Sequence, residues 1–390
     1  MFRNSDYITR GYNFMHNHMF PMHKRVSSLM VYATDLCDSG CKHCLIWAKR
    51  PVTHLSMENI EKIMKSKCIH PSTSVGLEGG EFLLHPQADE ILKWFSDHHP
   101  NFDLFSNCLK PENLIHSVEK YKPHRLYISL DGNESTYLHM RGKDGYASVL
   151  HVIENLKNKV PVFVMFTLSP YNDFNDLAHV AEVCKKNNVF LRVGIYNNIP
   201  FFDTIENAKQ SFVGQYKNDE VLTYSKVKEL REDKNTVEST SSEKKSRAIN
   251  DNDAFNIPET IKEFKENYDY IKLYKNWLSG NLRLKCNSIL DSVIILPDGS
   301  VPICQNLSIK LGNIFENSLD NIFNSAHTKE LHHHYSNNCN QCWISYHRKY
   351  DIVLYRTFEK YFGKRATAKI LGYYKWDWND QLSLKETIGR

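Results

Sequence analysis

Residues 28–44 read SLMVYATDLCDSGCKHC, an apolar run followed at once by three cysteines. A short apolar run bounded by polar residues is typical of a buried strand in a parallel sheet. Cys37, Cys41 and Cys44 follow it as Cys-x3-Cys-x2-Cys, so one loop supplies three thiolates. A cluster of four irons needs four ligands, and three leave one iron open to a substrate or cofactor. The sequence therefore predicts a reactive cluster on the loop after the first strand.

Downstream of this loop, short β-rich runs alternate with helical patterns up to about residue 195. This alternation is typical of βα units and a parallel sheet. The predicted strands span residues 28–33, 74–77, 102–106, 125–130, 162–168 and 189–195. We therefore expect an α/β fold, a partial (β/α)6 TIM-like barrel, with its reactive groups on loops at the carboxyl ends of the strands.

Length, charge and cysteine content limit the kinds of protein that this chain can be. The chain has 390 residues, 41% of them hydrophobic, enough for one large domain and a smaller one. A formal charge of +4 is too weak to indicate nucleic acid by itself. No stretch has the length of a membrane span or the pattern of a signal peptide. Ten cysteines without these features indicate a cytoplasmic protein that uses thiols for metal or redox chemistry. Cys68, Cys108 and Cys184 fall outside the spaced groups, and we expect them to be buried apolar residues.

Two further motifs follow predicted strands. Gly79-Gly80-Glu81 ends the second, and its glycines leave room for a ligand against the backbone while its carboxylate can accept from an ammonium group. Ser129 and Asp131 end the fourth, on one face by strand alternation, where both could meet polar groups of a nucleoside. Arg141 follows, a cation suited to a carboxylate.

These motifs, in this order, resemble the radical S-adenosylmethionine (radical SAM) superfamily over roughly residues 28–200. The resemblance implies that S-adenosylmethionine chelates the open iron and is cleaved reductively to methionine and a 5′-deoxyadenosyl radical, which abstracts a hydrogen atom from substrate. It further implies an electron donor such as flavodoxin or ferredoxin.

The resemblance also implies cofactor-binding roles for individual residues. Gly79, Gly80 and Glu81 would hold the methionyl ammonium, Ser129 the ribose or carboxylate, and Arg141 the carboxylate. His43 occupies the position before the last cysteine, where the family usually has an aromatic residue.

A second cysteine group comprises Cys286, Cys304, Cys339 and Cys342. Four thiolates make a closed site, suited to a fully ligated iron–sulfur cluster or to zinc. The segment resembles the Twitch domain, a shortened form of the SPASM extension found on some radical SAM enzymes. That resemblance implies an auxiliary [4Fe–4S] cluster, the second of two, which would accept an electron from substrate.

The expected domain plan places an N-terminal extension at 1–27, the barrel at 28–200, a polar insertion or linker at 201–270, the small cluster domain at 271–343 and a helical extension at 344–390. Residues 231–253 are polar and charged, which favours either a mobile linker or a lid. We also expect a hairpin at 292–304 and helices near 318–334 and 346–362.

The preferred hypothesis is an enzyme that oxidises a small molecule or sugar and uses the auxiliary cluster as electron acceptor. An alternative is a radical SAM enzyme that matures a peptide or protein. A third is a non-enzymatic zinc or iron–sulfur protein whose basic, aromatic C-terminal segment contacts nucleic acid. Arg192, Tyr196 and His139 are candidates for contact with substrate, and no residue is identified as its base.

Overall fold

The computed structural model describes residues 4–169, 171–196, 257–278, 280, 282–340 and 342–375. Seven parallel strands form one curved sheet in the order β6-β5-β4-β3-β2-β1-β7, with all neighbouring pairs parallel. Their bounds are β1 Ser28–Thr34, β2 Ser74–Gly79, β3 Phe102–Ser106, β4 Arg125–Ser129, β5 Val162–Leu168, β6 Phe190–Ile195 and β7 Ser292–Ile295. The expected α/β partial barrel is confirmed.

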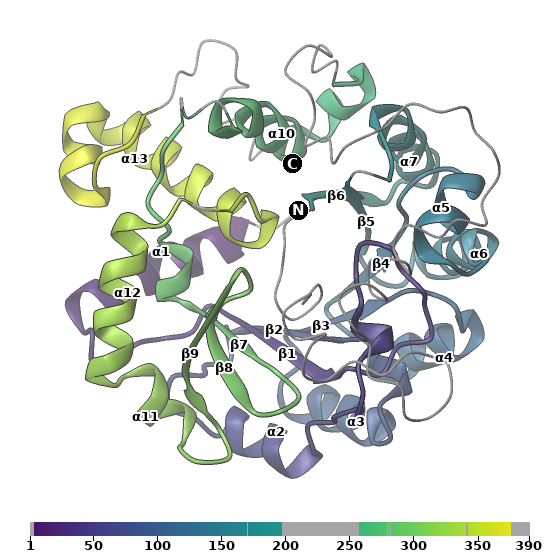
Figure 1. Ribbon diagram of the computed structural model, residues 1–390, viewed down its shortest axis with the longest axis horizontal. Coiled ribbons are helices and arrows are strands. Elements are labelled where there is room, and N and C mark those ends of the chain that lie inside the picture. Colours follow the sequence, from purple (N-terminus) through teal and green to yellow (C-terminus); the bar gives the residue numbers. More distant parts are fainter. Residues whose placement is uncertain are drawn as a thin grey trace.

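Helices cover the outer face of this sheet (Figure 1). They are α2 Met57–Met64, α3 Ala88–His98, α4 Pro111–Tyr121, α5 Glu134–Arg141, α6 Tyr146–Leu156 and α7 Phe174–Asn187. Local sequence explains where several begin. Pro111 occupies the first turn of α4, the side chain of Asn133 accepts from the amide of Thr136, and Asp173 forms a capping box with Asp176. The apolar faces of these helices and of the strands form one continuous core.

The C-terminal elements lie on the side that the curved sheet leaves open (Figure 1). They are α10 Lys265–Leu278, β8 Ser300–Cys304, β9 Leu307–Asn313, α11 Leu319–Phe323, α12 Ala326–Asn338 and α13 Ser345–Leu371. Helix α13 has a non-helical residue at Gly363, and its first three turns are buried. Short 3-10 turns complete the described chain at 46–48, 82–84, 259–263 and 288–290.

Three expectations need correction. The hairpin predicted over 292–304 does not form, because β7 adds to the large sheet beside β1 while β8 pairs antiparallel with β9. The turn at Pro297-Asp298-Gly299 is present, with the amide of Gly299 donating to Leu296, but it joins two different sheets. The helix expected near 318–334 is two helices, since Ser325 caps a new one. Because β7 joins the large sheet, the barrel has seven strands, whereas the sequence predicted six.

The N-terminal extension contains α1 Asn4–Met19. Arg10 pairs with Asp291 at 3.0 Å, and its backbone carbonyl accepts from the hydroxyl of Tyr350. Helix α1 is thereby fixed against the segment before β7 and against α13. Residues 231–253 lie outside the described residues. Within the described parts of the chain, no helix combines the length and apolar character needed to span a membrane.

Candidate active site

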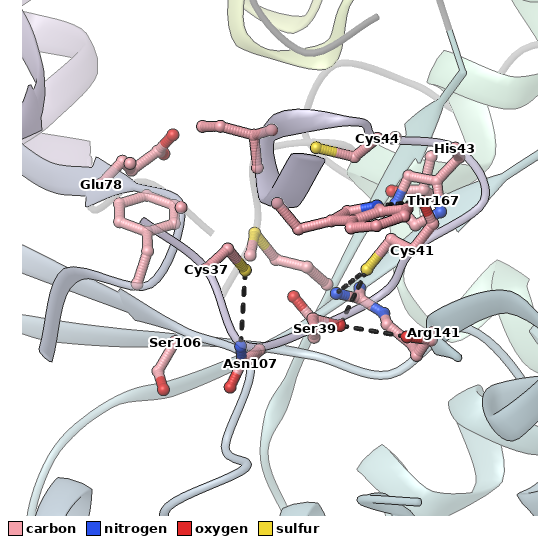
Figure 2. Close-up of a pocket in the computed structure, with 18 of the residues that line it drawn as sticks. Cys37, Ser39, Cys41, His43, Cys44, Glu78, Ser106, Asn107, Arg141 and Thr167 are labelled. Carbon is pink, nitrogen blue, oxygen red and sulfur yellow. Dashed lines mark hydrogen bonds between the residues drawn. The ribbon is translucent and has the colours of Figure 1, made fainter. Parts of the chain in front are cut away.

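The three cysteines of the first group open on one cavity of about 290 Å³ at the carboxyl ends of the strands (Figure 2). The loop that carries them pairs with the end of α5. The amide of Gly40 donates to the carbonyl of Arg141 at 2.9 Å, and that of Lys42 to the carbonyl of Met140 at 2.8 Å. The loop conformation is therefore set by contacts with a helix about 100 residues away in the chain.

Polar groups surround the sulfur atoms. The hydroxyl of Ser39 lies 3.0 Å from Cys41 Sγ, and Arg141 Nη1 donates to the same sulfur at 3.7 Å. Asn107 Nδ2 donates to Cys37 Sγ at 3.9 Å (Figure 2). Donors of this kind stabilise thiolates and the sulfur of metal clusters. Burial and the neighbouring Cys41 raise the pKa of the Cys37 thiol, so metal binding at this loop must displace protons.

The two glycines after β2 lie against the cysteine loop itself. The amide of Gly80 donates to Thr34 at 2.7 Å, and that of Glu81 to Leu36 at 2.8 Å. An added Cβ at Gly79 would stand 2.2 Å from the carbonyl oxygen of Thr34, and one at Gly80 would stand 2.2 Å from that of Leu36. Gly79 also has a φ of +150°. Both positions therefore require glycine for close approach of two backbones, in addition to any room they leave for a ligand.

The two carboxyl groups beside these glycines have different surroundings. Glu81 is 4% exposed and does not line the cavity; its Oε2 accepts from the amide of Asn107 at 2.7 Å, and burial raises its pKa to about 7. Glu78 does line the cavity, and burial raises its pKa to about 7 against the opposing effects of Arg192 and Tyr32. The sequence reasoning assigned a role to Glu81 and none to Glu78.

A signal for Glu78 was present in the sequence. Strand alternation places it on the face opposite Val75 and Leu77, which belong to the core, and at the carboxyl end of the strand. A carboxylate at that position of a parallel barrel faces the site by topology alone.

Of the remaining residues predicted to bind the cofactor, three line the cavity and one does not. His43, Ser129 and Arg141 line the cavity, and burial lowers the pKa of His43 to about 4. Asp131 is fully buried and does not line the cavity. Its carboxylate accepts from Arg141 Nε at 2.7 Å and from the amide of Thr167 at 2.8 Å. Asp131 therefore holds Arg141 in place, in contrast to the expected contact with a nucleoside.

The substrate candidates do not lie together. Tyr196 lines the cavity, whereas Arg192 lines a smaller adjoining hollow and stands 5.2 Å from the centre of the Tyr127 ring. His139 lines neither cavity; its Nδ1 lies 3.3 Å from Lys42 Nζ in exposed surroundings. The structure adds lining residues that the sequence did not identify, among them Asn107, Thr167, Ile344 and Ser345.

The four cysteines of the second group come from three segments of the chain, and they line one small cavity together with His347. Burial raises the pKa of Cys286 and Cys342 and that of Cys304 to about 12, while the Arg348 cation opposes this in Cys286 and Cys342. Zinc requires its ligand atoms within about 2.3 Å of one point. In the described part of the chain, no three His, Cys, Asp or Glu side chains are grouped to hold a single ion in that way. Four thiolates at one cavity can supply all the protein ligands of a fully ligated iron–sulfur cluster.

Comparison with known proteins agrees with this geometry. The profile of the radical SAM superfamily matches residues 31–184, and that of the SPASM iron–sulfur cluster-binding domain matches residues 286–343. No curated protein sequence matches significantly. Among solved structures, Streptococcus suis SuiB bound to S-adenosylmethionine is similar, with a TM-score of 0.53 and 13% identity over 85% of this chain and 74% of SuiB.

SuiB bound to its precursor peptide SuiA gives a TM-score of 0.52 at 13% identity, over 81% of this chain and 69% of that one. At this identity the likeness shows the fold. The two profile matches together imply [4Fe–4S] clusters and S-adenosylmethionine as cofactors. Residues 31–184 of this chain thus form a radical SAM domain, and residues 286–343 form an iron–sulfur cluster-binding domain of the SPASM type.

Proposed function

We propose that this protein is a radical SAM oxidoreductase in which the auxiliary cluster accepts an electron from the substrate. The observation that carries the proposal is the short path between the two cysteine sites. Ile344 and Ser345 line the cavity of the first site, and they follow Cys342 of the second by two and three residues. An electron leaving a substrate in the first cavity therefore has a short covalent route to the second site.

A second connection runs through side chains. Gln305, which follows Cys304, donates to the hydroxyl of Tyr32 at 2.6 Å. The hydroxyl of Tyr32 is in turn hydrogen-bonded to Glu78, which lines the first cavity. The two sites thus share a wall built from β1, β2 and the β8–β9 turn.

When bound, the first cluster and S-adenosylmethionine supply a 5′-deoxyadenosyl radical that removes one hydrogen atom from substrate. We assign the binding of the methionyl carboxylate to Arg141, and contacts with the rest of the cofactor to Gly79, Gly80, Ser129 and His43. Cys37, Cys41 and Cys44 hold the first cluster in this proposal, and Cys286, Cys304, Cys339 and Cys342 the second.

Glu78 is the carboxylate that we assign as proton acceptor. The substrate would lose a hydrogen atom to the radical, a proton to Glu78 and an electron to the auxiliary cluster, which amounts to a two-electron oxidation. A pKa of about 7 suits a group that takes a proton near neutral pH. With a true substrate, Glu78→Gln is expected to form 5′-deoxyadenosine without the oxidised product.

Small molecules or sugars are the substrates we propose first. Peptide modification is the second candidate, because the similar fold of SuiB was crystallised with the precursor peptide SuiA. We further propose a flavodoxin or ferredoxin as electron donor. We place the protein in the cytoplasm, because the cysteines assigned to the two clusters need a reducing compartment.

Anaerobic reconstitution with iron and sulfide tests the assignment. We expect about eight irons per chain, as two clusters require, whereas about four irons with one zinc would remove the auxiliary cluster. Cys44→Ala is expected to abolish the formation of 5′-deoxyadenosine, and Cys304→Ala to retain part of it. A Cys44→Ala variant that still produced 5′-deoxyadenosine would refute the catalytic assignment.

A further inference from the structure

His347 lies in the first turn of α13 and is 1% exposed. It lines the cavity shared by the four cysteines of the auxiliary site. Its Nδ1 atom stands 2.8 Å from the hydroxyl of Ser288, whereas its Nε2 atom has no hydrogen-bond partner among the described residues. An unpaired buried nitrogen is costly, so the group that occupies this cavity is the natural partner for Nε2.

The surroundings determine which nitrogen carries the proton. A neutral imidazole has one N–H, and the groups that contact the two ring nitrogens decide which of them carries it. The hydroxyl of Ser288 can donate to Nδ1; its other neighbour, Cys286 Sγ, is more distant at 3.9 Å. With Ser288 as the donor to Nδ1, the ring hydrogen lies on Nε2. Sulfide and thiolate sulfurs accept hydrogen bonds, so an Nε2–H facing them is favourable.

We propose that His347 donates an Nε2–H hydrogen bond to a sulfur of the auxiliary cluster and thereby raises its reduction potential. Hydrogen bonds to sulfur stabilise the more negative, reduced state of a cluster. The inference rests on the proposed function, because it concerns the cluster assigned there as electron acceptor. It identifies His347 as a residue that makes this cluster a better acceptor.

Residues next to His347 in α13 hold its side chain at the cavity. Arg348 is fully buried, and its Nε donates to the carbonyl of Cys342 at 3.1 Å. The carboxylate of Asp351 accepts from the amide of Asn287, the residue that follows Cys286, at 3.0 Å. The first two turns of α13 are therefore tied to two of the cysteine segments, so the imidazole has little freedom to turn away from the cavity.

The test uses the full-length chain with Cys37, Cys41 and Cys44 replaced by alanine, so that the auxiliary cluster alone contributes to the spectra. The protein is labelled with 15N-histidine, reconstituted with iron and sulfide, and reduced. Pulsed electron paramagnetic resonance should detect one 15N coupling to the cluster in this parent and none in His347→Gln. A redox titration should give a lower midpoint potential for His347→Leu, and one close to the parent for His347→Gln, whose amide can still donate.

His332→Gln is the matched control. His332 is also buried, at 2% exposed, and its Nε2 also lacks a partner among the described residues, but it lies in α12 beside Lys24 and does not line the cavity. This control should keep both the coupling and the potential of the parent.

Three results would overturn the inference alone: a parent cluster without 15N coupling, a coupling that persists in His347→Gln, or an unchanged potential in His347→Leu. If His347→Leu fails to bind iron, the comparison of the parent with His347→Gln still decides. A site that takes zinc and gives no cluster spectrum would overturn the proposed function, and the inference with it.

Discussion

The contact between Gly80 and the cysteine loop gives a sharp prediction for Gly80→Ala. The added methyl group would stand 2.2 Å from the carbonyl oxygen of Leu36 and 2.9 Å from Cβ of Cys37. Ordinary contact begins near 3.4 Å, so the two backbones must separate by about 1 Å. This movement would also break the 2.8 Å hydrogen bond from the amide of Glu81 to Leu36.

The expected cost follows from these two losses. Overpacking costs up to about 3 kcal/mol, and a lost backbone hydrogen bond about 1 kcal/mol. We therefore expect Gly80→Ala to lower the free energy of unfolding of the cluster-free protein by about 4 kcal/mol, measured by urea denaturation. Because Cys37 follows Leu36 directly, iron bound at the first site should fall as well.

Gly40→Ala is the control within the same loop. Its added methyl group would have its nearest neighbour at 3.6 Å, which is ordinary contact. We expect its unfolding free energy to stay within about 0.5 kcal/mol of the wild type and its iron content to be unchanged. The reasoning is refuted if Gly80→Ala is as stable as Gly40→Ala and binds as much iron.

Two further predictions concern buried charge. Asp131→Asn leaves the buried Arg141 cation without its charged partner, and should lower the free energy of unfolding by about 3 kcal/mol or more. Urea denaturation measures this loss, and a value below about 1 kcal/mol would contradict the prediction. Glu81 has a pKa of about 7 in the folded protein and 4.5 as its ordinary value, so its stabilising contribution is complete below pH 4.5 and is lost as the pH rises through 7. Between pH 5 and 8, the wild type should lose about 3 kcal/mol of stability relative to Glu81→Gln, as denaturation at both pH values would show; parallel pH profiles would rule this out.

Local patterns predicted the first six strands of the barrel well. The strands at 102–106 and 162–168 have the predicted bounds, because each is a β-rich run flanked by residues that favour turns. The pairing of β7 was predicted wrongly, because a local sequence pattern does not show which strand a segment pairs with. Its four residues look like one arm of a hairpin, and only the free edge of β1 makes them a strand of the barrel.

Helix α1 was missed for a different reason. Four of its apolar residues, at positions 8, 12, 15 and 19, are exposed, and its buried side combines Phe14 with the polar residues Arg10, Asn13 and Asn17. This helix is anchored by polar contacts, as in the hydrogen bonds from Asn17 to the carbonyls of Arg25 and Leu290. A search for an apolar face directed at a core cannot find such a helix.

The site was predictable where motif and topology agree. The three cysteines of the first loop, both glycines after β2, Ser129 and Arg141 all lie at the cavity or against its cysteine loop. The directions of Glu81 and Asp131 were not predictable, because a one-position difference along a strand or turn decides whether a carboxylate faces a ligand or a neighbouring backbone amide. Both accept a hydrogen bond from a backbone amide of another strand or loop, and no sequence motif indicates such a contact.

The two cysteine sites depend on each other through the parts of the fold that the sequence did not predict. β7 places the segment after Cys286 beside β1, which leads into the first cysteine loop. Residues 344 and 345 then close the first cavity immediately after Cys342. One link is the pairing of β7 with β1 and the other is the short stretch of chain after Cys342, so a change in the position of the auxiliary site would also change the wall of the radical site. This coupling explains why the C-terminal segment completes the sheet of the barrel, where a separately folded appendage would leave the first cavity without part of its wall.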